Sequence, residues 1–122
     1  MRYFIPMLCL LALPLTANAE EVIRETKTAS ITCTTTPTQL KTSISTRKDR
    51  YLAVNVPSSA AVQVFIGDST VTSANGLDVP PGKTYSTNKK VSKGLILYCV
   101  TASGSVTVRV QETVTGAGVI ND

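Results

Sequence analysis

The chain of 122 residues contains no histidine and no tryptophan. Histidine is the commonest general base and metal ligand, so its absence excludes the usual Ser-His and Cys-His nucleophile pairs. The acidic residues show no spacing typical of paired-carboxylate hydrolysis, and the glycines lack phosphate-loop spacing. We therefore predict a protein that is not an enzyme, with no small-molecule substrate, no cofactor and no metal.

Aromatic residues are also scarce, at 5% of the chain. Beyond residue 19 only four occur, Tyr51, Phe65, Tyr85 and Tyr98. Too few aromatics are present for a sugar-binding platform, which disfavours a lectin. The short basic clusters at 47–50 and 89–93 have no interleaved aromatics to stack on bases, so no nucleic-acid partner is predicted. Weak contact with an anionic surface stays open.

The first 19 residues have the pattern of a secretory signal peptide. Arg2 provides a basic start, residues 3–15 form an apolar run, and Ala17-Asn18-Ala19 provides an Ala-x-Ala cleavage site. The alternative is a membrane anchor, but the run is short for a bilayer and contains two prolines. We expect export to the periplasm, the cell surface or a virion.

The three cysteines fall into two groups. Cys9 would be removed with the signal peptide, whereas Cys33 and Cys99 remain. An even number of cysteines in an exported chain favours a disulfide, which would stabilise a small domain by about 4 kcal/mol. Two buried free thiols are the alternative. Residues 20–122 carry 11 basic and 8 acidic residues, a net charge near +3, and fit one small domain.

The rest of the chain has the composition of strands, since it is rich in Thr, Val and Ser and no window has a helical stripe. Alternation of apolar and polar residues, with Gly, Asn and Pro at the turns, predicts about eight short strands. The predicted strands are 30–36, 39–45, 51–56, 61–66, 70–73, 83–86, 95–101 and 106–111. This pattern indicates an all-β fold, a small antiparallel β-sandwich of the jelly-roll or Greek-key kind.

An immunoglobulin domain is disfavoured. The chain has no tryptophan, and Tyr98 immediately precedes Cys99 instead of lying two residues before it. The predicted organisation is a signal peptide at 1–19, a flexible lead-in or edge strand at 20–29, the sandwich at 30–112 and a C-terminal arm at 113–122.

Candidate binding residues are Asp68, Asn75, Asp78 and Lys83, on turns where small β-sandwiches often bind partners. The first three could supply oxygen ligands to calcium. Asp and Asn are also the residues that such turns need for their own geometry, and we favour this second interpretation.

Several short motifs follow one another in a fixed order. They are Arg50-Tyr51-Leu52, Val54-Asn55-Val56, Val64-Phe65-Ile66-Gly67, Val71-Thr72, Asn75-Gly76, Pro81-Gly82, Leu95-Ile96-Leu97-Tyr98, Ala102-Ser103-Gly104 and residues 106–112. In this order residues 38–112 resemble a small β-sandwich module recurrent in structural proteins of tailed bacteriophages. The resemblance implies a head-fibre, decoration or tail-associated component that self-assembles and has no enzymatic activity. The signal peptide and the cysteine pair depart from that pattern.

The hypothesis is an exported structural or binding module, a phage-derived component of a virion or surface assembly. Its partner would be another protein or further copies of itself. The alternative is a periplasmic or secreted phage or prophage factor that binds or masks a receptor, or inhibits a partner protein.

Overall fold

The structure is a computed structural model that describes residues 21–117. The predicted signal peptide and Cys9 lie outside these residues, as does the end of the predicted C-terminal arm. Eight strands are present: β1 (Glu21–Cys33), β2 (Thr38–Leu40), β3 (Tyr51–Asn55), β4 (Val64–Gly67), β5 (Leu77–Val79), β6 (Thr84–Ser86), β7 (Leu97–Val100) and β8 (Val106–Ala117). The all-β prediction is confirmed. Within the described range no helix is long and apolar enough to cross a membrane.

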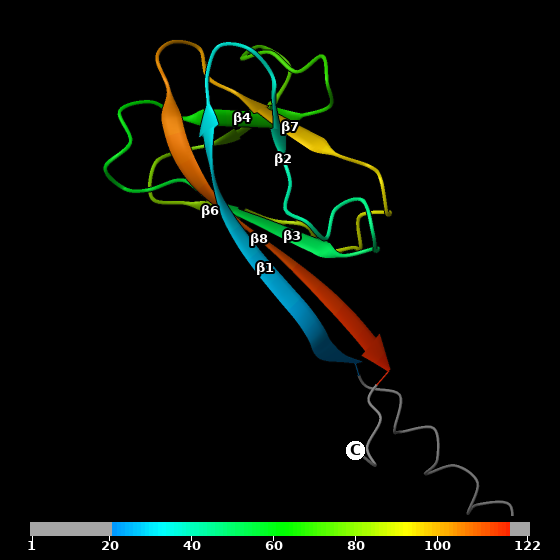
Figure 1. Cartoon of the computed structure of the whole chain (residues 1–122). Helices are drawn as coiled ribbons and strands as arrows, with labels where there is room; N and C mark the ends of the chain where they lie inside the picture. The colour runs from blue at the N-terminus through cyan, green and yellow to red at the C-terminus, as the bar shows by residue number, and fades with distance from the viewer. Residues whose placement is uncertain (1–20, 118–122) are drawn as a thin grey trace, which may run out of the picture.

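The strands form two four-stranded antiparallel sheets. Sheet A has the order β1-β8-β3-β6, and sheet B has the order β2-β7-β4-β5. Strand β1 pairs with β8, β2 with β7, β3 with β6 and β4 with β5, as in one long hairpin rolled up on itself. This is the arrangement of a jelly roll, so the jelly-roll prediction is confirmed. Figure 1 shows β1 and β8 continuing out of the sandwich as a two-stranded ribbon.

The middle of the chain contains less strand than the sequence predicts. The predicted strand at 39–45 ends at Leu40, the one at 61–66 starts only at Val64, and 70–73 forms no strand at all. In the last segment Asn75 Oδ1 accepts a hydrogen bond from Thr72 N at 2.7 Å. Side chains that bind nearby backbone groups compete with a sheet ladder, and this competition turns the chain here.

The ends of the sandwich contain more strand than the sequence predicts. Strand β1 starts at Glu21 and so includes nearly all of residues 20–29, which the sequence left as a flexible lead-in or an edge strand. Strand β8 continues to Ala117, so the prediction that the last strand ends at 111 was wrong. The two strands pair from Glu21 opposite Ala117 to Cys33 opposite Val106. The sequence pattern fades in β1 because residues 21–24 are exposed on both faces, although the backbone still forms a ladder with β8.

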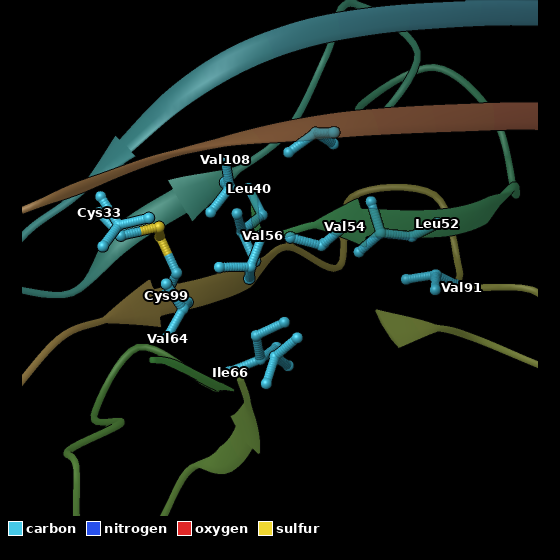
Figure 2. Packing of buried hydrophobic residues seen from close by; sticks show 13 residues of the cluster. Cys33, Leu40, Leu52, Val54, Val56, Val64, Ile66, Val91, Cys99 and Val108 are labelled. Atoms are coloured by element: carbon cyan, nitrogen blue, oxygen red, sulfur yellow. A yellow bond between two sulfur atoms is a disulfide. The ribbon is translucent and has the colours of Figure 1, made fainter. Parts of the chain in front are cut away.

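The core lies between the two sheets and consists mainly of valine, leucine and isoleucine (Figure 2). Cys33 at the end of β1 and Cys99 in β7 form a disulfide across the sheets, with their Cα atoms 5.6 Å apart. The predicted disulfide is therefore confirmed. A smaller cluster of Phe65, Val71 and Val100 lies under the β4–β5 connection.

Candidate interaction surface

The four residues predicted to bind a partner are distributed along the chain around β5. Asp68 and Asn75 belong to the β4–β5 connection, Asp78 lies in β5, and Lys83 lies in the turn before β6. Lys83 makes backbone hydrogen bonds in that turn, from its N to Pro80 O and from Val56 N to its O. Whether these four residues contact a partner stays a prediction.

The side chain of Asp68 organises its own turn. Its Oδ1 accepts hydrogen bonds from the Thr70 hydroxyl at 2.7 Å and from the Thr70 amide at 2.8 Å. These bonds, the hydroxyl bond above all, hold the pKa of the Asp68 carboxyl below its ordinary value. Residues 21–117 contain no group of three or more His, Cys, Asp or Glu side chains that could hold a metal ion. The arrangement supports the turn interpretation of Asp68 and Asn75.

A more extended feature is the β1–β8 ribbon, which comprises β1 and the part of β8 that pairs with it. Strand β1 lies at the edge of sheet A, with β8 on one side and no described strand on the other. Strand β3 pairs with β8 only from Arg109 to Thr113. Residues 114–117 of β8 therefore pair with β1 alone, and we call them, with residues 21–25, the ribbon tip.

The ribbon tip exposes apolar side chains. Ile23 is 69% exposed and Val22 is 36% exposed. By contrast, Glu21 and Glu25 pair with Lys90 and Arg47 of their own chain, at 3.3 Å and 3.0 Å.

A bulge between Ile23 and Glu25 leaves Arg24 without a register partner. Its guanidinium turns back and donates to the carbonyl of Ala117. Gly116 makes room for this side chain, because a Cβ there would lie 3.1 Å from Arg24 Nε. The charged groups thus bind within the molecule, whereas Val22 and Ile23 of the tip face outward.

The outer face of sheet A is polar and shallowly hollow. Its strand register places Ser30, Arg109, Asn55 and Thr84 in one row across all four strands. A hollow of about 750 Å³ covers this row, and its lining consists of Thr28, Ala29, Ser30, Ala53, Asn55, Thr84, Arg109, Val110 and Gln111. Arg109 is the one charged residue of that lining. This hollow therefore offers one cation among uncharged residues, both polar and small apolar.

An unpredicted feature is a buried ion pair on the inward side of β8. Arg50 Nε donates to Glu112 Oε2 at 2.9 Å, and both side chains are fully buried. Thr42 and Ser45 donate their hydroxyl protons to the other carboxylate oxygen. In the sequence, Arg50 was one of a cluster of surface charges. The buried pair could have been predicted from Glu112. This residue follows Val106, Val108 and Val110 on the inward side of one strand, and a carboxylate buried there requires a partner.

Comparison with known proteins yields little. No family model matches the chain, and no curated protein matches it. A solved structure described as "Bacillus endospore appendages form a novel family of disulfide-linked pili" contains a similar chain, with 17% sequence identity and a TM-score of 0.48. The match covers 82% of this chain and 92% of that chain. The resemblance to phage virion modules rests on the sequence motifs alone.

Proposed function

We propose that this protein is an exported, non-enzymatic assembly module that joins other protein surfaces, further copies of itself included, through the β1–β8 ribbon. The observation that carries the proposal is the free edge of β1. This strand has 13 residues and is the longest of the eight strands within residues 21–117.

A free strand edge presents unpaired backbone N–H and C=O groups to any chain that can extend the sheet. The other edge strands, β2, β5 and β6, have three residues each. Short edges of this kind offer few backbone groups for pairing. The ribbon tip adds apolar contact area next to the long edge, because Val22 and Ile23 point into solvent. Burial of such side chains at an interface stabilises it by about 25 cal/mol per Å² before the costs of association.

The finer assignment, a component of a virion or surface assembly, is supported by the order of motifs between residues 38 and 112. The predicted signal peptide favours an assembly outside the cytoplasm. The disulfide supports the same location, because such bonds persist in oxidising compartments.

The polar hollow on sheet A favours a second candidate function. A factor that masks a receptor or inhibits a partner protein would bind through this face, with Arg109 opposite an acidic group. Replacement of Arg109 by Ala would weaken such binding and leave self-assembly through the ribbon unchanged.

The proposal is tested by size-exclusion chromatography with light scattering and by electron microscopy over a range of concentrations. We expect the wild-type protein to form oligomers and Ile23→Lys to weaken them, because a charge at the tip opposes close packing. Leu95→Lys is the matched control, since Leu95 is 56% exposed but lies outside the ribbon. A wild-type protein that stays monomeric and binds no partner would contradict the proposal.

A further inference from the structure

We propose that β1 is an exchangeable strand, which leaves its own sandwich and completes sheet A of a second copy. Cys33 then forms its disulfide with Cys99 of that second copy. This inference rests on the proposed self-assembly and adds a second contact to it, through the edge of β1 that pairs with β8.

The first observation is that β1 contributes little to its own core. The register places Glu25, Lys27, Ala29, Ile31 and Cys33 on the inward side, opposite the inward residues of β8. Of these five, Cys33 alone is fully buried, and Lys27 is exposed. The free energy that holds β1 therefore comes mainly from the backbone ladder with β8 and from the disulfide.

The second observation is that the ladder and the disulfide can each form either within one chain or between two copies of it. The flank of β8 that receives β1 accepts the same strand from any copy, with the same ladder and the same facing side chains. Exchange of an identical element is a low-cost route to association, because closed and exchanged forms share almost all contacts. The exposed ion pairs of β1, Glu21–Lys90 and Glu25–Arg47, also form equally well between copies and contribute little.

The third observation concerns the connection between β1 and β2. It comprises residues 34–37, four residues that reach roughly 13 Å when extended. One hydrogen bond of this connection is long-range, from Thr101 N to Thr34 O at 2.8 Å. The others are local, such as the bond from Thr36 N to Thr34 Oγ1 at 3.2 Å. Short connections of this kind favour strand exchange, since opening them converts a tight turn into a straight hinge.

The disulfide makes the exchange permanent. Two thiols lose two electrons and two protons to a disulfide oxidant such as oxidised glutathione, which is reduced to two thiols. Both cysteines, Cys33 at the end of β1 and Cys99 in β7, are fully buried in the closed form. In the folded protein, a Cys33–Cys99 bond between two chains therefore requires that β1 of one chain lie beside β8 of the other, in the place of that chain's own β1.

The test uses full-length Cys33→Ser and Cys99→Ser chains expressed together and exported to an oxidising compartment. In this mixture any Cys33–Cys99 disulfide must join two chains. We expect a covalent dimer on non-reducing gels, with the Cys33–Cys99 peptide pair identified by mass spectrometry. Each variant expressed alone is the control and should give no such dimer. Dimers in the single-variant samples at the same level, or no Cys33–Cys99 peptide in the mixture, would overturn the proposal.

A second measurement covers the case in which the single variants fail to fold. Wild-type chains labelled with ¹⁵N are reduced, unfolded, mixed with unlabelled chains and refolded with oxidised glutathione. Exchange predicts Cys33–Cys99 peptide pairs that contain one labelled and one unlabelled member, and their absence from oligomers rejects exchange. Wild-type oligomers without mixed pairs would leave the proposed assembly function intact, whereas a wild-type protein without oligomers would contradict both.

Discussion

Arg50 and Glu112 form an ion pair that is entirely removed from solvent, with 2.9 Å between Nε and Oε2. The remaining guanidinium nitrogens donate to the carbonyls of Ser92 and Leu95 at 2.8 Å and 2.9 Å. The pair therefore connects β8 with the β6–β7 connection, in which Ser92 and Leu95 lie. Burial of two charges is costly, and it is tolerated here because almost every polar group around them has a partner.

We predict that Glu112→Ala destabilises the fold by about 3–5 kcal/mol, because Arg50 would be left buried without a counter-charge. Urea unfolding measures the change. Glu25→Ala is the matched control. It removes an exposed carboxylate from an arginine pair and should cost less than about 1 kcal/mol. Equal losses in the two variants would contradict a special role for the buried pair.

Replacing both charges should not restore full stability. In Arg50→Met/Glu112→Leu the hydroxyls of Thr42 and Ser45 lose their acceptor, and the partly buried carbonyls of Ser92 and Leu95 lose their donor. Each unsatisfied group costs about 1–3 kcal/mol. We expect the double variant to unfold at a lower urea concentration than the wild type. A double variant as stable as the wild type would show that the surrounding hydrogen bonds contribute nothing net.

Reduction of the Cys33–Cys99 disulfide should lower the free energy of unfolding by about 4 kcal/mol, since it closes a loop with a sequence separation of 66 residues. Thermal unfolding with and without reductant measures the effect. The Cys33→Ser/Cys99→Ser protein is the control and should not respond to reductant. Labelling of either cysteine by a thiol probe in native, unreduced protein would contradict the disulfide.

The Asp68 turn predicts a pH dependence. Its folded-state pKa is lower than the unfolded one, so its contribution to stability is present above the unfolded pKa and is lost as the pH falls through the folded pKa. Thr70→Val removes the largest cause, and we expect the pKa of Asp68 to rise toward 3.8. An NMR titration of the carboxyl carbon measures this shift. Thr84→Val, outside the turn, should leave the titration unchanged, and a wild-type pKa in Thr70→Val would refute the assignment.

Any side chain at Gly76 should lower the stability of the fold. A Cβ at this position would lie 2.7 Å from Phe65 Cβ and 2.7 Å from Val71 Cγ2, two well-packed neighbours. We expect Gly76→Ala to destabilise by about 1–3 kcal/mol through overpacking, as measured by urea unfolding. Gly116→Ala is the control, because its Cβ meets the flexible side chain of Arg24, and it should change stability by only about 0.5 kcal/mol. A Gly76→Ala protein as stable as this control would contradict the predicted clash.

The sequence contained enough information for the fold class, the disulfide and the strands with strong alternation. Val106, Val108 and Val110 point inward between polar residues, and this period of two identifies β8. The position of β5 was not predictable in the same way. Its three residues form a strand only because β4 supplies a partner. Val71, which the sequence pattern placed in a predicted strand at 70–73, instead packs against Phe65 and Val100 from the β4–β5 connection.

The ribbon was difficult to predict for a different reason. Residues 21–28 are mostly charged or polar, and their strand conformation depends on pairing with a segment about 90 residues away. Local patterns do not report such a partner. The candidate binding residues were chosen by residue type, and the side chains of two of them, Asp68 and Asn75, are used by the turns themselves.

The pairing of β1 with β8 also has a kinetic consequence. The first and last described strands are neighbours in sheet A, so β1 can pair with β8 only after the last part of the chain has been made. Contacts between residues so far apart in sequence slow folding, because a long loop must close before any contact stabilises it. During synthesis from the N-terminus, β1 and Cys33 are therefore made well before β8 and Cys99, the strand and the cysteine with which they pair.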